Sequence, residues 1–427
     1  MRRLLSWLAR LAAALLLRRV EVADAQRLPK GRPVLLVANH FNGFVDALVI
    51  MSVLPRAPRL VAKASLGQLL PARWLAGAMG VVFVRRRVDS AGPLDNDSAF
   101  RECHAALVKR DMVAIFPEGT THDRPRIDPI KTGAARIALG ARAAGATIIA
   151  IVPLGLTFPD KVALRTSALV QFGEPIDLDQ TCPSGLDADN AKAVRELTAH
   201  IDAGLRSVSQ DFDDTETALA LEQAAHIALS SEGKPEPSLE DRYDYARRLG
   251  AAPKRARDAV RKDVGRYNTL LAGLRLTDAD VITPTSPTRL VRAAIRIAIL
   301  VVLLGGLAAA AAPVNAGPAM LVALVSLLIK TPVSKGTVRV IVGMIAFPTA
   351  WVTAAVITAD GFVACSLVVV SSAVGAVAAI WVVERAFALA MMILRWRAQL
   401  ERAATIDMAE ALRAEVVATT RRAVGDG

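Results

Sequence analysis

A histidine and a carboxylate follow a short apolar run near the start of the chain. The run Val34-Leu35-Leu36-Val37 is typical of a buried strand. It leads into Ala38-Asn39-His40-Phe41-Asn42-Gly43-Phe44-Val45-Asp46. An imidazole can remove a proton from a hydroxyl when a carboxylate orients its ring and stabilises the imidazolium. His40 and Asp46 are six positions apart, so they would meet only if the turn at Asn42-Gly43 brings them together.

The alternative to a catalytic pair is an ordinary turn histidine beside a solvated aspartate. A second polar cluster favours the catalytic pair. After the apolar run at 113–116 comes Pro117-Glu118-Gly119-Thr120-Thr121-His122-Asp123, which puts a carboxylate and hydroxyls on one tight loop. Lys131 then precedes an Ala-rich helix, whose first N–H groups could bind an anion. His122 belongs to this loop, next to the Glu118-Gly119 pair, and is a candidate to assist at the site. No Gly-x-Ser-x-Gly elbow occurs, so the histidine would act on a substrate hydroxyl directly.

Three arginines mark a third cluster. The strand-like run Gly80-Val81-Val82-Phe83-Val84 ends in Arg85-Arg86-Arg87. A guanidinium matches the geometry of a phosphate with two parallel hydrogen bonds. The alternative is a solvated basic turn.

Taken together, these blocks resemble the glycerolipid acyltransferase family, which includes glycerol-phosphate and lysophosphatidate acyltransferases. Four motifs match in order over roughly residues 20–175: Asn39-His40 with Asp46, Gly80 with Arg86, Phe116 to Thr120, and Ile151-Val152-Pro153-Leu154-Gly155. Most members have four residues between the motif histidine and aspartate, whereas this chain has five. The longer spacing resembles a subgroup with fungal glycerol-phosphate/dihydroxyacetone-phosphate acyltransferases, which favours glycerol phosphate as the acceptor.

The resemblance implies a role for each motif residue. His40 would be the general base that activates the acceptor hydroxyl for attack on an acyl thioester, and Asp46 would orient it. The residues implied in binding the acceptor are Asn39, Lys63, Arg86, Glu118, Gly119, Thr120 and Lys131. The donor would be acyl-CoA or acyl-carrier protein. We expect no metal and no cofactor, because a thioester is already activated.

Composition points to a membrane rather than a nucleic acid as the partner. The 427 residues are 53% hydrophobic and carry a net charge of +12. The basic residues flank apolar segments and are not interleaved with stacking aromatics, so we expect them to face anionic lipid headgroups. The cysteines, Cys103, Cys182 and Cys365, match no metal or disulfide spacing and suggest a reducing compartment.

The chain divides into five predicted parts. Residues 1–19 place leucines and Trp7 on one helical face, which predicts an amphipathic helix lying on the membrane surface; a core helix is the alternative. Residues 20–208 alternate short strands and helices, as an α/β acyltransferase domain would. Residues 209–289 read as a helical insertion or linker. Residues 290–395 follow as a transmembrane region, and 396–427 as a charged cytoplasmic helical tail. We expect His104, His200 and His226 to be structural.

Four apolar stretches predict about four transmembrane helices, at 294–312, 316–329, 338–358 and 362–383. The links at 313–317 and 359–361 carry no basic residue, whereas the ends and the middle link do. The positive-inside rule then places both termini and the catalytic domain on the cytoplasmic side, at the cell membrane if the source is bacterial.

Three classes of function compete. The first is a membrane O-acyltransferase of phosphatidic acid synthesis acting on glycerol 3-phosphate, dihydroxyacetone phosphate or a lysolipid such as 1-acylglycerol 3-phosphate. The second is a non-catalytic lipid-binding scaffold, against which the intact His40 and Asp46 argue. The third is a transporter, which we rank last because no charged residue lies deep in the predicted spans.

Overall fold

The computed structural model describes residues 1–63, 80–84, 96–161, 163, 165–233, 236–401 and 403–425. These form two compact units. One comprises residues 1–214 with 331–337, and the other comprises 215–330 with 338–427.

The first unit is built on an eight-stranded sheet of mixed direction. Its order is β1-β7-β6-β2-β5-β3-β4, with β8 paired to β6. The strands are β1 (Arg19–Ala23), β2 (Val34–Ala38), β3 (Arg59–Lys63), β4 (Val82–Val84), β5 (Met112–Ile115), β6 (Ala150–Thr157), β7 (Ser167–Phe172) and β8 (Ile176–Asp177). Strand β2 runs parallel to both β5 and β6, whereas β6 and β7 are antiparallel. This confirms the predicted α/β fold.

Helices cover both faces of the sheet, so its central strands are buried throughout. All residues of β2, β5 and β6 are buried, which explains why they read as continuous apolar runs. The helices and single turns of this unit are α1 (Arg2–Leu16), η1 (Ala25–Arg27), α2 (Phe44–Val53), α4 (Asp97–Val108), α5 (Gly133–Ala143), α6 (Leu178–Thr181) and α7 (Ala191–Val208). The core that joins β2 and β5 to α4, α5 and α7 includes Val37, Ile115, Ile137 and Leu197.

Helix α1 belongs to this unit rather than standing as a separate part. It contacts α2 and buries the small residues Ser6, Ala9 and Ala13. Its large apolar residues are exposed: Leu4, Trp7, Leu8 and Leu11. Arg10 donates to the carbonyl oxygens of Ser52 and Leu54, so it anchors the helix to the protein instead of facing lipid.

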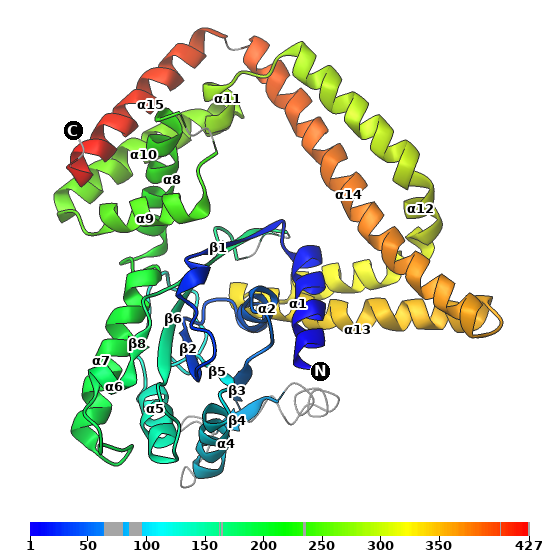
Figure 1. Ribbon diagram of the computed structural model, residues 1–427. Helices are drawn as coiled ribbons and strands as arrows, with labels where there is room; N and C mark the ends of the chain where they lie inside the picture. The colour runs from blue at the N-terminus through cyan, green and yellow to red at the C-terminus, as the bar shows by residue number, and fades with distance from the viewer. Residues whose placement is uncertain are drawn as a thin grey trace. The chain divides into compact units, whose positions relative to one another are not determined.

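The second unit combines a helical bundle with long apolar helices (Figure 1). The bundle contains α8 (Thr215–Ser231), α9 (Leu239–Gly250), α10 (Lys254–Leu274), α11 (Asp278–Ile282) and α15 (Ala403–Val424). The predicted insertion and the predicted tail are therefore parts of one bundle. Arg413 of α15 joins them, since it donates to Asp278 Oδ1 at 2.9 Å and to Ser230 Oγ at 2.6 Å.

Three helices in the described part of the chain are long and apolar enough to cross a membrane, where the sequence predicted about four. They are α12 (Pro287–Leu328), α13 (Pro332–Thr358) and α14 (Phe362–Glu401). The link predicted at 313–317 does not end a helix, because α12 continues through Pro313 and Pro318. Figure 1 shows α12 bending where its colour turns from yellow-green to yellow, and internal prolines are a common cause of such kinks.

Candidate active site

The histidine of the first motif lies where the central strand ends. Because β2 and β5 are parallel neighbours, their carboxyl ends share one edge of the sheet. Strand β2 ends at Ala38 and is followed by Asn39 and His40, and β5 ends at Ile115, shortly before Glu118. The fold therefore brings together two motifs that are almost eighty residues apart in the sequence.

The predicted turn brings His40 and Asp46 into contact. Gly43 has a φ of +57°, a conformation that favours glycine, and it precedes the first turn of α2, where Asp46 lies. His40 Nδ1 is 3.0 Å from Asp46 Oδ2, and the same oxygen accepts a hydrogen bond of 2.7 Å from the Asn42 N–H. Asp46 is fully buried, and the His40 side chain is 20% exposed. This geometry orients the imidazole and leaves its Nε2 as the nitrogen for a substrate.

The ring of His40 is also held from the neighbouring strand. It stacks on Phe116, with the ring centroids 4.0 Å apart and the planes 15° from parallel. Its backbone N–H donates to Glu118 Oε1 at 2.8 Å. The residues after β5 thus position both the backbone and the ring of the histidine.

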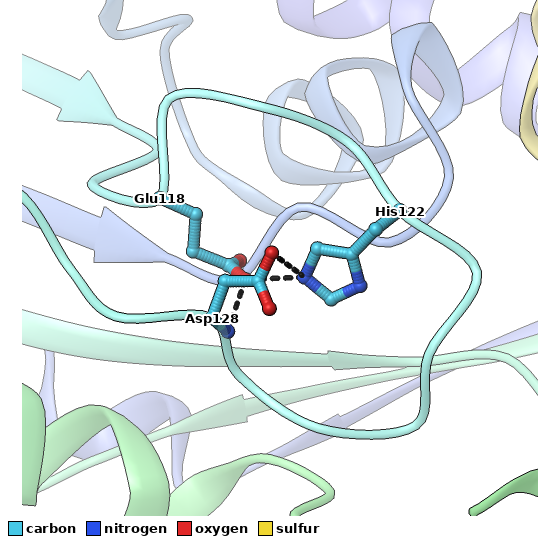
Figure 2. A group of neighbouring side chains, drawn as sticks. All are labelled: Glu118, His122 and Asp128. Atoms are coloured by element: carbon cyan, nitrogen blue, oxygen red, sulfur yellow. Dashed lines mark hydrogen bonds and ion pairs between the residues drawn. The ribbon is translucent and has the colours of Figure 1, made fainter.

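Glu118 connects His40 to a second histidine. Its Oε2 accepts hydrogen bonds from the Asp128 N–H at 2.9 Å and lies 2.6 Å from His122 Nε2. Figure 2 shows the carboxylates of Glu118 and Asp128 converging on the His122 ring. One atom from each of these side chains lies within 4.8 Å of the others, a spacing that could also hold a metal ion. We interpret the cluster of Glu118, His122 and Asp128 as a hydrogen-bonded brace that holds the loop after β5, because Glu118 Oε2 already bonds to the other two residues.

Two residues predicted to bind substrate are engaged with the protein. Asn39 is fully buried; its amide donates to the Leu156 carbonyl at 2.9 Å and accepts from the Leu156 N–H at 2.6 Å. Glu118 is only 2% exposed. Both side chains hold the ends of strands in place in this structure, and their contact with substrate stays a prediction.

The remaining predicted binding residues differ in where they lie. Thr120 and Lys131 are exposed, and Lys131 Nζ lies over Gly119, where an added Cβ would come within 2.6 Å of it. The Gly119 N–H donates to the Phe116 carbonyl at 3.1 Å. Lys63 ends β3, and Arg86 lies outside the described residues.

Sequence reasoning missed Lys161, which lies between β6 and β7. Its Nζ is 4.8 Å from the centroid of the Phe41 ring. The only signal was a lysine a few residues beyond the fourth motif, which is too common a feature to single out.

Comparison with known proteins identifies the family of the domain that carries this site. Residues 19–157 match the family model described as Acyltransferase, so the chain carries a domain of the Acyltransferase family.

Its relatives include "Glycerol-3-phosphate O-acyltransferase 2" of Saccharomyces cerevisiae, 35% identical over 138 residues, or 32% of this chain and 19% of the relative. The mouse "1-acyl-sn-glycerol-3-phosphate acyltransferase alpha" is 33% identical over 189 residues, or 43% of this chain and 61% of the relative. The chain thus spans less than two thirds of either relative. A solved structure, the 1-acyl-sn-glycerophosphate acyltransferase PlsC from Thermotoga maritima, aligns at 20% identity and a TM-score of 0.35, over 48% of this chain and 76% of that one.

Proposed function

We propose that this protein transfers a fatty acyl group from an acyl thioester to a hydroxyl of glycerol 3-phosphate. The contact between His40 Nδ1 and Asp46 Oδ2 is the observation that carries the proposal. The names of the two yeast relatives, both glycerol-3-phosphate O-acyltransferases, support this acceptor.

The proposed reaction uses the pair as base and then as acid. His40 Nε2 takes the proton from the acceptor hydroxyl while its oxygen attacks the thioester carbonyl. The tetrahedral intermediate then collapses, the carbon–sulfur bond breaks, and the imidazolium returns the proton to the leaving thiolate. Asp46 stabilises the imidazolium through Nδ1 during this cycle. The donor is acyl-CoA or acyl-carrier protein, and the proposed step requires no cofactor and no metal.

For acceptor binding we propose the exposed groups near the histidine. Lys131 and Thr120 line the loop after β5, and Lys63 with Arg86 are the further cations that the family resemblance implies. Asn39 and Glu118 are then positioning residues, because their polar atoms are used within the protein.

A second acceptor is supported by different relatives. The mouse and human relatives are named 1-acyl-sn-glycerol-3-phosphate acyltransferases, so lysophosphatidate is the alternative acceptor. A non-catalytic lipid-binding scaffold is the alternative of another class, and the intact His40–Asp46 contact weighs against it.

We further propose that the protein is an integral membrane protein whose bundle faces the cytoplasm, as the basic residues at the helix ends favour. This placement requires an even number of crossings between the start of α12 and the end of α14. Helices α12 and α14 pack together. Gln399, near the end of α14, accepts from the Thr285 N–H at 3.1 Å, just before α12 begins. The two chain segments that enter the bundle therefore lie at the same end of this helix pair. On α1, the exposed Leu4, Trp7, Leu8 and Leu11 would lie in the membrane surface.

An acceptor panel tests the proposal. The full chain, purified in detergent and reconstituted in anionic vesicles, would be given labelled acyl-CoA or acyl-carrier protein with glycerol 3-phosphate, dihydroxyacetone phosphate or lysophosphatidate. We expect the highest kcat/KM with glycerol 3-phosphate. Preference for lysophosphatidate would reassign the acceptor, and no transfer to any of them would reject the enzyme in favour of the scaffold.

A further inference from the structure

Lys161 places a buried ammonium group beside the loop that carries His40. Its Nζ is buried and has no hydrogen-bond partner among the described residues. The nearest favourable contact is the face of Phe41, 4.8 Å away. Phe41 directly follows His40 and is 1% exposed. Burying a cation without a hydrogen-bond acceptor is costly, so this position calls for a compensating charge.

The charges around Lys161 are carboxylates. Burial lowers the pKa of Lys161 below its ordinary value, and the negative charges of Asp123, Asp46 and Glu118 oppose that shift. Glu118 is already occupied by the brace described above. Asp123 is exposed, so water and salt screen its charge. Asp46 is fully buried, where a nearby cation has the largest effect.

Asp46 has a buried carboxylate oxygen that lacks a hydrogen-bond donor among the described residues. Its Oδ2 takes the hydrogen bonds from His40 and Asn42, whereas its Oδ1 is buried without a hydrogen-bond partner in the described part of the chain. A buried carboxylate with one unsatisfied oxygen and a buried ammonium with no acceptor each lower the cost of burying the other's charge.

We infer that Lys161 is a positioning residue of the His40–Asp46 pair, whose buried ammonium supplies the positive charge that balances the buried Asp46 carboxylate and keeps its hydrogen bond to His40 in place. The alternative role, binding of the acceptor phosphate by Lys161, is disfavoured because the neighbouring carboxylates would repel a phosphate dianion.

A double-mutant cycle on stability tests the charge pairing without any reference to turnover. Lys161→Met keeps the aliphatic stem over Phe41 and removes the charge. We expect Lys161→Met and Asp46→Asn each to lower the melting temperature of the full chain in detergent by several degrees, and the double variant to lower it no further than the worse single variant. Additive losses would overturn the inference. The matched control is a second double-mutant cycle that combines Lys161→Met with Asp123→Asn. Non-additive losses in the Asp123 cycle but not in the Asp46 cycle would also overturn the inference.

The catalytic consequence rests on the proposed function and is measured separately. We expect Lys161→Met to lower kcat at least tenfold with the KM values of acceptor and donor within about twofold of wild type, and Lys161→Arg to recover most of kcat. Unchanged kcat, or a rise in acceptor KM alone, would overturn the positioning role. If the wild-type chain transfers no acyl group, the proposed function fails, and the stability cycle still decides whether Lys161 and Asp46 are paired.

Discussion

Two histidines at the strand ends of the α/β unit and one histidine of the helical bundle lie in opposite environments. In the α/β unit, His40 and His122 each have a ring nitrogen within hydrogen-bond distance of a buried carboxylate. In the helical bundle, His226 has a buried Nδ1 with no hydrogen-bond partner among the described residues, and burial together with the charge of Arg242 lowers its pKa. A carboxylate partner prepares a histidine to accept and release a proton, whereas desolvation keeps it neutral.

The same contrast applies to other buried polar groups. Asn39 and Glu118 of the α/β unit are buried where strands β2 and β5 end, near His40, whereas Asn315 in α12 joins three apolar helices. Its amide donates to the carbonyls of Ala311 and Ser372 and accepts from Trp351 Nε1 at 2.8 Å. We therefore expect substitutions in the first set to change turnover and those in the second to change stability.

The largest effect should come from Asp46→Asn. The amide cannot hold the imidazolium as a carboxylate does, so kcat should fall by roughly 10²–10⁴-fold. Steady-state kinetics of the reconstituted chain, with the far-ultraviolet circular dichroism as a check on folding, would measure this. A folded variant with near-normal turnover would show that the carboxylate partner of His40 is not needed for catalysis, and would contradict the contrast with His226.

A smaller loss is expected for Glu118→Gln. An amide must turn its NH₂ group toward at least one of the donors that Glu118 now accepts from, which are the N–H groups of His40 and Asp128 and the ring of His122. We expect about a tenfold loss of kcat, which corresponds to about 1.4 kcal/mol and lies within the usual cost of an unsatisfied buried polar group. The matched control is Glu196→Gln on the exposed face of α7, and equal losses in both would show that the brace has no special role.

The helical unit should respond in stability rather than in turnover. Asn315→Leu keeps the volume but leaves Trp351 Nε1 without its acceptor, at a cost of about 1–2 kcal/mol. Thermal unfolding in detergent would show this as a lower melting temperature. Thr349→Val is the control, since the Thr349 hydroxyl donates to the carbonyl of Ile345 in its own helix. An equal shift in both variants would contradict a role for Asn315 in joining the helices.

The smallest effect concerns His226 and pH. Because the pKa of His226 in the folded protein lies below its ordinary value of 6.5, the unfolded chain binds the proton first as pH falls. Its contribution to stability is therefore complete above pH 6.5 and is lost below it. Arg242 and Arg413 add to the lowering, and Asp278 and Glu236 oppose it. His226→Gln should flatten the fall in melting temperature between pH 7.5 and 5.5; an unchanged pH dependence would show that His226 is not a source of it.

The sequence predicted the α/β fold and the meeting of His40 and Asp46 because strand ends and a glycine turn are local signals. It could not show that the oxygens of Glu118 and the amide of Asn39 are used inside the protein, since their partners, such as Asp128 and Leu156, are identified only by tertiary structure. Lys161 was missed for the same reason.

The difference between the predicted and the observed number of long apolar helices has a physical cause. Pro313 and the polar Asn315 indicate a loop when they are read locally, but in the structure Asn315 is buried among neighbouring helices and α12 continues through it. The insertion and the tail are joined by long-range contacts, among them the hydrogen bonds of Arg413, that no local pattern reveals.

Side-by-side turnover of wild type, His40→Ala and His200→Ala tests the central claim most directly. His200 is exposed on α7, with Nδ1 2.9 Å from the Glu196 carbonyl of its own helix. We predict that the reconstituted wild type and His200→Ala transfer acyl groups to glycerol 3-phosphate at similar rates, while the folded His40→Ala chain is slower by roughly 10²–10⁴-fold. Equal rates for all three chains would contradict the assignment of His40 as the general base.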